Sequence, residues 1–575
     1  LYFRATVGGG DARVEMLPWS PLGITRKDAD FTDDLRFLGS SQGQVTDAYT
    51  MPRGKRGPTS NTGVEEVLSF RTPQGARMDL IVRAYDDGFA FRYHFPETAP
   101  GRFGVIREAT GFAFAAGSHA TLMPVYEPGA NQTSEWLTGL RVGTAAPTGA
   151  WWALPGLIAS ADGAHWALLT ESGLNAGSAA LGLAGKSVGA IYRVRFPHPD
   201  EEAGQGEVQP SFSLPWSTPW RMVILSDHLA GIVESTLATD LAPPAAPGNW
   251  DWVRPGNVAG HLGEAGLVGP MSFDGAVAQA ELAVAMGWGY ARLPGGWPAQ
   301  SGGRWRPLVE ETASHKVGLL VGPKDAAALS LADLASAGLK GVRVAVSNSG
   351  KPEVIASLLA LLEEAGQRRL MVEFEGRIPG AGWDRTYPHL LSATTWRSGT
   401  GESDGAWRAR QNLFECFTRN VLSPMQPMPI AFNHRARKSP MTFGHILGLT
   451  VVFESGLRSF VDATLPKAAV ELLSGLPSAW DETRLLDGDP GHVVILARRK
   501  GRTWYVAGLN GDSVAQKRNV AMDLVGTGLS NMVLLADGPS PTELLVTERD
   551  RNATDVQAIK MMPYGGFLMR LSPLR

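Results

Sequence analysis

Residues 341–389 read GVRVAVSNSGKPEVIASLLALLEEAGQRRLMVEFEGRIPGAGWDRTYPH and contain the pattern that decides the fold. The apolar run at 341–346 predicts a strand, and the apolar spacing over 352–366 predicts an amphipathic helix. A second apolar run at 370–374 predicts the next strand. A strand, a helix and another strand in this order are typical of a parallel sheet or barrel.

The same alternation continues on both sides of this stretch. Strands are predicted at 290–293 and 317–321, and helices at 276–286 and 331–337. We therefore predict a (β/α)8-type barrel, short or degenerate, over residues 246–485. The Pro-rich stretch APPAAPG at 242–248 predicts the boundary before it.

The regions that flank the predicted barrel are predicted to be all-β. In residues 1–245, the runs at 78–85 and 89–95 alternate in polarity, and Asp86-Asp87-Gly88 predicts a tight hairpin turn between them. A large antiparallel β-sandwich fits this region. Residues 486–575 return to short strands, so a smaller C-terminal β-sandwich is predicted there. The fold class is thus multidomain, with β and α/β parts.

Composition excludes several classes of protein. The net charge is −3 and no run of Lys or Arg is present, which gives no support for nucleic-acid binding. No apolar run is long enough to span a membrane. The one cysteine, Cys416, excludes an intrachain disulfide and a cysteine-based zinc cluster. The chain starts in a predicted strand, so no signal peptide is expected within these residues.

The loop after residue 374 combines a carboxylate with aromatic and basic side chains. Glu375 follows the strand directly, and Trp383, Arg385 and Tyr387 come soon after it. In an α/β barrel, polar residues just after a strand lie on the catalytic face. A carboxylate near aromatic rings suits a sugar site, and the 17 Trp favour the same interpretation. An ordinary loop, with Glu375 paired to an arginine, is the alternative.

The chain resembles glycoside hydrolase family 97 through seven motifs in the family's order. They lie at residues 20–24, 85–93, 217–221, 286–290, 385–388, 480–483 and 497–505. The resemblance implies an N-terminal β-sandwich, a catalytic barrel and a C-terminal β-sandwich. It also implies exo-acting α-glycosidase activity on α-linked sugars or oligosaccharides, a calcium cofactor, and a periplasmic or secreted location.

Several carboxylates of the family pattern are replaced in this chain. Ala345 stands where retaining members have the nucleophilic aspartate, and Pro294 and Gln426 replace two further acidic residues. Alanine cannot attack a sugar, so the resemblance implies an inverting rather than a retaining enzyme, if it is active.

The resemblance implies roles for the carboxylates that remain. Glu375 fits the base or a metal ligand of inverting members. Glu402 fits the general acid if two residues are inserted before it, whereas without that gap threonines at 394 and 400 take the acidic positions. Asp325 and Asp384 are auxiliary candidates. Glu373 and Glu482 are further candidates, the latter with a structural role at the end of the barrel.

Substrate and metal contacts are also expected from the resemblance. The expected metal ligands are Glu171, Glu375 and Glu402. The expected sugar-binding residues are Trp383, Arg385, Tyr387, Trp297 and Trp396.

Two other interpretations remain open. One is a glycan-binding pseudoenzyme that kept the fold and lost the acid and the nucleophile. The other is a glycosidase with a changed substrate and relocated carboxylates. Carboxyl groups about 6–10 Å apart across one cleft would support hydrolysis with inversion.

Overall fold

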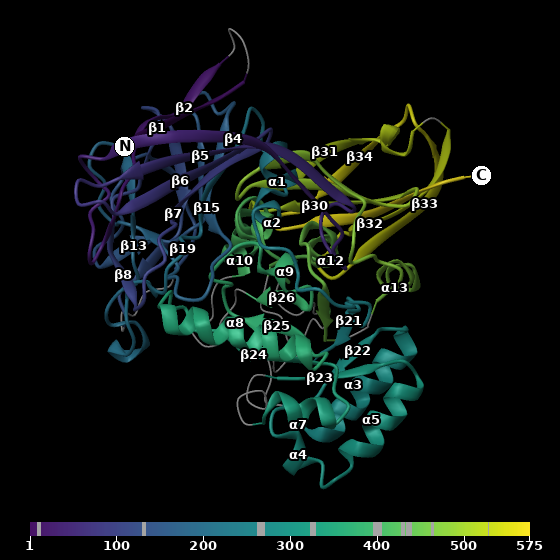
Figure 1. The fold of residues 1–575 in the computed structure, drawn as a ribbon. Helices are drawn as coiled ribbons and strands as arrows, with labels where there is room; N and C mark the ends of the chain where they lie inside the picture. Colours follow the sequence, from purple (N-terminus) through teal and green to yellow (C-terminus); the bar gives the residue numbers. More distant parts are fainter. Residues whose placement is uncertain are drawn as a thin grey trace.

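The computed structural model describes residues 1–8, 13–128, 134–260, 271–322, 329–394, 405–426, 432, 440–461, 465–526 and 528–574. The chain forms an N-terminal β domain, a central parallel barrel and a C-terminal β domain (Figure 1). The two β domains lie side by side, and the strands and helices of the barrel lie below them in that view. In the described part of the chain, no helix is long and apolar enough to span a bilayer.

The N-terminal domain is built on one large antiparallel sheet. Its strands follow the order β12 (Leu137–Arg141), β10 (His119–Leu122), β14 (Gly156–Ala159), β15 (Trp166–Ser172), β20 (Trp220–Ser226), β7 (Gly88–Phe95), β6 (Arg77–Tyr85), β5 (Thr59–Arg71) and β4 (Arg36–Tyr49). The short strand β19 (Trp216–Ser217) pairs with β7. Tyr85 pairs with Gly88, so Asp86 and Asp87 form the predicted two-residue hairpin turn.

Smaller sheets cover this large sheet and complete the sandwich. They contain β1 (Tyr2–Val7), β2 (Val14–Pro21), β3 (Ile24–Arg26), β8 (Phe103–Glu108), β9 (Gly111–Ala113), β11 (Pro124–Tyr126), β13 (Ala150–Trp152), β16 (Gly182–Leu183), β17 (Ile191–Arg195) and β18 (Ser211–Phe212). Apolar side chains from both layers form one core, which includes Phe91, Phe112 and Trp152. Helices α1 (Leu229–Glu234) and α2 (Leu237–Asp240) follow the last strand, and residues 241–255 contain no helix or strand.

The central domain is a parallel sheet that closes almost completely. Its strands follow the order β26 (Leu390–Thr394), β25 (Met371–Glu375), β24 (Gly341–Ala345), β23 (Gly318–Val321), β22 (Tyr290–Arg292), β21 (Gly256–Ala259) and β27 (Leu457–Phe460). The strands and helices predicted between 276 and 374 are all present, with ends that differ by up to three residues. The predicted barrel is thus confirmed.

Among the described residues between β26 and β27, one residue bridges to the wall of the barrel. Gln426 pairs with Thr394 at the end of β26, so it stands between β26 and β27. Its side chain completes the wall, because the Gln426 carbonyl accepts a hydrogen bond from the backbone N–H of Ser459 in β27 (3.1 Å). We call this stretch between β26 and β27 the seam. On the other side, the backbone N–H of Gln426 donates to the Ala393 carbonyl of β26 (3.0 Å).

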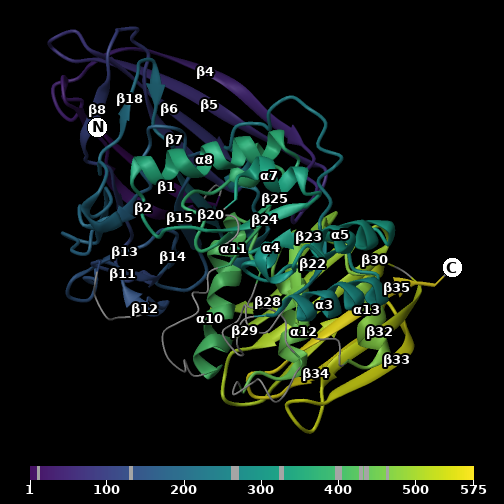
Figure 2. The ribbon, with the colours of Figure 1, turned by 90° about the horizontal axis from the view of Figure 1, so that it is seen from below.

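Helices cover the outer side of the barrel strands. Figure 2 shows α8 (Pro352–Gln367), α7 (Leu331–Ser336), α5 (Trp305–Ser314), α3 (Phe273–Met286) and α13 (Lys467–Ser474) following one another around the sheet. The other α-helices in the described residues of this region are α4 (Trp297–Gln300), α9 (Trp383–Thr386), α10 (Gly405–Phe417), α11 (Arg419–Leu422) and α12 (Phe443–Val452). Inside the barrel, Val258, Tyr290, Leu320 and Met371 form an apolar core towards the start of the strands.

The C-terminal domain is an antiparallel sandwich. Its main sheet has the order β28 (Glu482–Asp489), β29 (Val493–Lys500), β30 (Thr503–Asn510), β35 (Gly566–Pro573), β32 (Leu529–Asp537) and β33 (Leu544–Asn552). The second layer is the pair β31 (Gln516–Ala521) and β34 (Val556–Met561). Strand β28 begins at Glu482, four residues before the predicted boundary at 486.

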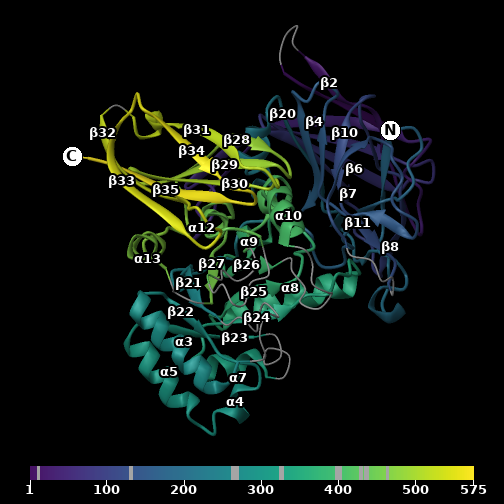
Figure 3. The same ribbon diagram turned by 180° about the vertical axis from the view of Figure 1, so that it is seen from behind.

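Two helices connect the barrel to the β domains. All ten residues of α12 are buried, since α12 packs against the C-terminal sheet and shares one apolar core with residues of the barrel. Helix α10 lies between the N-terminal and C-terminal domains (Figure 3). Its Glu415 accepts a hydrogen bond from the indole of Trp136 (3.1 Å), which belongs to the N-terminal domain.

Candidate active site

The carboxyl ends of the barrel strands carry one carboxylate in the described residues. Of the strand ends that the structure describes, β25 alone ends in an acidic residue, Glu375. Glu375 is in register with Ala345 of β24 and Thr394 of β26, so these three side chains share one face of the sheet. Glu375 is partly exposed and Ala345 is exposed, so both are accessible at the end of the barrel.

A buried ion cluster shows that this face points into the barrel. Glu373, two residues before Glu375, binds Arg343 of β24 (2.8 Å) and Arg292 of β22 (2.7 Å). Because β22 lies three strands from β25, the side chains of Glu373 and Arg292 can be in contact only if both point into the barrel interior. The pairing of β24 with β25 has no register shift, so Glu375 points inwards as well.

Glu373 remains ionised and is poorly suited to donate a proton. Burial opposes its ionisation, but Arg343 and Arg292 outweigh burial and lower the pKa of the Glu373 carboxyl. Gln426 also donates a hydrogen bond to Glu373, which ties the seam to the same cluster. The cluster lies directly below the strand ends and fills the interior with polar side chains. Its carboxylate balances buried arginines, so its role here is structural.

A glycine turn carries the chain away from Glu375. The backbone N–H of Gly376 donates to the Thr394 carbonyl (2.8 Å), and Gly376 has a φ of +133°, a region that other residues rarely adopt. A Cβ atom at this position would lie 2.9 Å from the Val346 carbonyl oxygen. Glycine is therefore required for the chain to leave β25 in this direction, towards Arg377.

The loop that contains the RTYP motif, residues 385–388, extends to the amino end of the barrel strands. The Tyr387 hydroxyl is hydrogen-bonded to Glu363 in the last turns of α8, and His389 stacks on Trp250 (5.5 Å between ring centroids). Strand β26 then begins at Leu390. Tyr387 therefore lies near the amino end of the strands, away from Glu375. This corrects the expectation that the whole loop lies on the catalytic face.

Asp384 also lies away from the strand ends. Its carboxylate is 2.5 Å from the Arg53 guanidinium, and Arg53 also binds Glu454 (2.7 Å). Arg53 donates to the carbonyl of Leu390, the first residue of β26, so the cluster lies where β26 begins. Arg53 belongs to the N-terminal domain, and the cluster joins that domain to the barrel.

The two described tryptophans of the predicted sugar platform are buried. Trp383 is 2% exposed and its indole N–H donates to the Leu174 carbonyl (3.0 Å). Trp297 is also 2% exposed and packs edge-on against Trp305. Neither indole has an exposed face on which a sugar ring can stack.

The side chain of Arg385, also expected to bind sugar, is instead engaged in contacts within the protein. Its guanidinium donates to the carbonyls of Thr239 (2.8 Å) and Asp240 (2.7 Å), and it lies over the ring of Tyr49. Glu482 pairs with Arg484 and Arg499 in the C-terminal sheet, which fits its expected structural role. Glu402, Asp325 and Trp396 lie outside the described residues.

Glu171 is buried in a hydrogen-bonded ion pair. One carboxylate oxygen accepts from the Leu181 N–H (2.7 Å), and the other accepts from Arg221 (3.2 Å). Burial raises the pKa of Glu171 to about 7, although Arg221 opposes this shift. Calcium needs several oxygen ligands at once. Among the described residues, no group of three or more His, Cys, Asp or Glu is placed to hold a metal, so these residues alone do not fit calcium.

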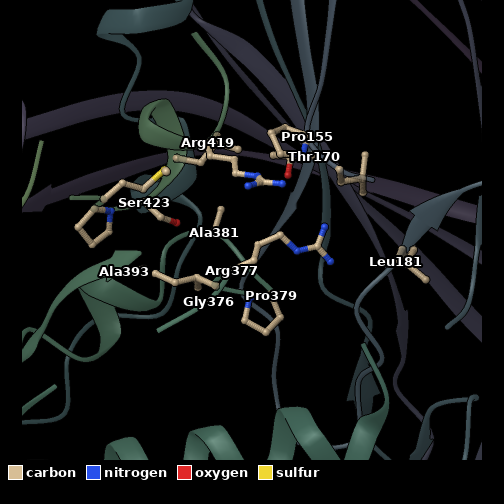
Figure 4. Close-up of a pocket in the computed structure, with 15 residues that line it drawn as sticks. Pro155, Thr170, Leu181, Gly376, Arg377, Pro379, Ala381, Ala393, Arg419 and Ser423 are labelled. Atoms are coloured by element: carbon tan, nitrogen blue, oxygen red, sulfur yellow. The ribbon is translucent and has the colours of Figure 1, made fainter. Parts of the chain in front are cut away.

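A cavity of about 40 Å³, lined by Gly376 directly after Glu375, lies between the barrel and the N-terminal domain (Figure 4). The barrel side is formed by residues 376–379, Ala381, Ala393 and 422–425, and the other side by Leu154, Pro155, Thr170 and Leu181. Two arginines, Arg377 and Arg419, also line it. Neither was predicted as a site residue from the sequence. The position of Arg377 two residues after a strand-end carboxylate was the available indication.

This combination of domains and site defines a class of protein. A parallel barrel with a carboxylate at a strand end, held between two β-sandwiches, is the architecture of a multidomain glycoside hydrolase. The chain belongs to glycoside hydrolase family 97. The family's N-terminal domain model, "Glycosyl-hydrolase 97 N-terminal", matches residues 11–244. Its C-terminal model, "Glycosyl-hydrolase 97 C-terminal, oligomerisation", matches residues 479–572, so the two matches lie on either side of the barrel.

Known proteins resemble the chain over nearly its whole length. A probable retaining alpha-galactosidase of Streptomyces bingchenggensis is 28% identical over 95% of this chain and 86% of that protein. The crystal structure of a beta-arabinopyranosidase is similar with a TM-score of 0.87 and 26% identity, covering 97% and 95% of the two chains. A family 97 enzyme of Pseudoalteromonas sp. strain K8, solved with acarbose, has the same fold (TM-score 0.83, 20% identity, 98% and 96% covered).

Proposed function

We propose that the protein hydrolyses α-linked sugars or oligosaccharides at the carboxyl ends of the barrel strands. The observation that carries the proposal is the position of Glu375, which points into the barrel from the last residue of β25, between Ala345 and Thr394. Membership of a glycoside hydrolase family and the names of the relatives support it. The same names support a carbohydrate as the partner.

We further propose that hydrolysis inverts the anomeric configuration. The relative from Streptomyces is named as retaining, and retention needs a carboxylate that forms a bond with the sugar. Position 345 carries a methyl group instead, so this chain cannot form that intermediate there. In the inverting route Glu375 is the base that activates water, and Glu402 is the acid that protonates the leaving oxygen. Asp325 is the auxiliary group, whereas Asp384 lies at the start of β26, away from the strand ends.

The test is the stereochemistry of the product. Aryl α-galactosides and α-glucosides are incubated with the protein, and proton NMR records the first anomer that appears. The β-anomer is expected, and Glu375→Gln should abolish its formation. Glu482→Gln, which also removes a carboxylate but lies in the C-terminal sheet, is the matched control and should keep the activity. First release of the α-anomer would refute inversion.

The second candidate is a protein that binds glycans without hydrolysing them. The observation that favours it is Ala345, an exposed methyl group at the strand end where a nucleophile is expected. Ala345→Asp distinguishes the two. If only the nucleophile is missing, this variant should attack an aryl α-glycoside, release the phenolate, and return the α-sugar after water cleaves the new bond. Glycan binding by an inactive wild type, together with an active variant, would establish the second candidate.

Glu171 already uses both of its carboxylate oxygens, so of the expected ligands a calcium site would have to be built from Glu375 and Glu402. A periplasmic or secreted location, which the family implies, is part of the proposal, and cell fractionation with an antibody against the protein tests it.

A further inference from the structure

Two guanidinium groups share the cavity beside Glu375. Arg377 enters from the turn after β25, and Arg419 enters from the start of α11. Figure 4 shows both side chains extending into the same space, towards the side formed by Pro155, Thr170 and Leu181. Most of the other lining residues are apolar, so the two positive charges lie in poorly solvated surroundings.

Among the residues that the structure describes, Arg377 has no anionic partner in contact with it. Within the described part of the chain, its guanidinium makes no hydrogen bond and no ion pair within 4.0 Å. Glu171 and Glu201 are close enough to act on its charge, but both are engaged elsewhere. Glu171 binds Arg221, and Glu201 accepts hydrogen bonds from Ser349 (2.8 Å) and the Gly350 N–H (3.0 Å).

Arg419 is only partly neutralised. One of its nitrogens lies 3.3 Å from Glu415, and another contacts the sulfur of Met123. Its Nε is buried and has no hydrogen-bond acceptor within the described residues. The guanidinium therefore keeps an unused donor next to the cavity, and a buried donor without an acceptor is costly.

The two charges also act on each other. Burial, together with the positive charge of Arg419, lowers the pKa of Arg377 to about 10. Two like charges kept together in an apolar cavity are unfavourable unless an anion joins them. Guanidinium groups bind carboxylates and sulfates through paired hydrogen bonds, which makes an oxyanion the natural occupant.

We propose that Arg377 and Arg419 bind an acidic group of the sugar substrate, a uronic acid carboxylate, in the cavity beside Glu375. This inference deepens the proposed function and rests on it, since it assumes that the sugar is bound at the strand ends. The cavity of about 40 Å³ has room for roughly three water molecules, which suits a carboxylate and not a whole sugar ring. The ring would then lie outside it, at the strand ends.

The spacing of the two residues supports this arrangement. Glu375 and Arg377 are two residues apart, so their Cα atoms are separated by at most about 7 Å. Glu375 points into the barrel, and the turn at Gly376 directs the chain towards the cavity. A single sugar unit can therefore present its anomeric carbon to Glu375 while its carboxylate reaches Arg377.

Binding without turnover tests the inference. Isothermal titration compares methyl α-galacturonoside with methyl α-galactoside, using the Glu375→Gln protein so that no hydrolysis occurs. Since a hydrogen bond to a charged group contributes about 1.5–3 kcal/mol, the uronoside should bind about tenfold to a hundredfold more tightly. Arg377→Gln should remove this preference. Arg368→Gln, the same change at the exposed arginine directly after α8, should keep it.

Other outcomes overturn the inference. Equal affinity for the two glycosides, or a preference that Arg377→Gln leaves intact, would refute it. Inorganic phosphate and sulfate are titrated in parallel. If either binds in an Arg377-dependent way while the uronoside binds no better than the galactoside, the cavity is a site for a free anion and the acidic sugar is excluded. Failure of the hydrolysis assay with a preserved uronoside preference would refute only the proposed reaction.

Discussion

Asp384→Asn tests whether this carboxylate has a structural or a catalytic role. Asp384 was a catalytic candidate from the sequence, but the structure pairs it with Arg53, whose side chain is 2% exposed. Burial disfavours the charged form of Arg53, yet Glu454 and Asp384 outweigh burial and raise its pKa. The three residues act as one buried cluster between the N-terminal domain and the barrel.

The size of the effect follows from the partner that remains. Removing one partner of a buried ion pair typically costs about 3–5 kcal/mol. In Asp384→Asn, Glu454 still binds Arg53 at 2.7 Å, so we expect a smaller loss of about 2 kcal/mol. For a folding unit of the size of the barrel this lowers the unfolding midpoint by about 4–8 °C. The double variant with Glu454→Gln leaves Arg53 without a carboxylate, so its loss should exceed the sum of the two single losses.

The assay compares thermal unfolding with activity measured on folded protein. Asp384→Asn should lower the unfolding midpoint and keep the kcat on aryl α-glycosides at a temperature where it is folded. Glu454→Gln should behave alike, because it removes the other half of the same cluster. An unchanged midpoint together with a large loss of kcat would refute this reasoning and make Asp384 a catalytic residue.

Three further predictions concern the surroundings of the site. Burial raises the pKa of Glu171 from 4.5 to about 7, so the folded protein keeps a proton that the unfolded chain releases. The free energy of unfolding of the wild type, relative to that of Glu171→Gln, should therefore be greatest below pH 4.5 and fall by about 3 kcal/mol as the pH rises to 7. If the unfolding free energies of the two proteins change with pH in parallel, this prediction is wrong. Gly376→Ala should destabilise the protein by about 1–3 kcal/mol in denaturant melts and weaken uronoside binding, since its Cβ meets the Val346 carbonyl; an unchanged melt would show that the turn adapts. EDTA should leave the unfolding midpoint unchanged, and a decrease that calcium reverses would show a metal site.

The barrel could be predicted because its strands and helices have clear local patterns. The helix predicted at 352–366 is observed at Pro352–Gln367, since its apolar spacing and its first-turn proline are both local features. The seam could not be predicted in the same way. A single bridging residue such as Gln426 has no periodicity, and its contribution depends on where Glu373 and Ser459 lie in space.

The site could be predicted only where it depends on a strand end. The sequence places Glu375 at the end of a strand, and the structure has it there. The sequence pattern does not indicate how far a loop extends from the strand end. Asp384 and Tyr387 were therefore expected near Glu375, although they lie towards the start of β26. Arg292 and Arg343 are a sequence signal for the buried ion cluster. An arginine in an apolar strand requires a buried anion, and Glu373 is that anion.

The seam makes the barrel wall uneven in its resistance to opening. Between β24 and β25, residues 341–345 all lie in register with residues of the neighbouring strand. Within β27, Ser459 donates to the Gln426 side chain, and the backbone bond from Gly456 to the Leu391 carbonyl of β26 (2.8 Å) lies just before the strand. Amide hydrogens of β27 on this side should therefore exchange with solvent through local opening, well before those of β24 and β25. The barrel would then open locally at the seam, where Gln426 is held to the charged interior by its hydrogen bond to Glu373.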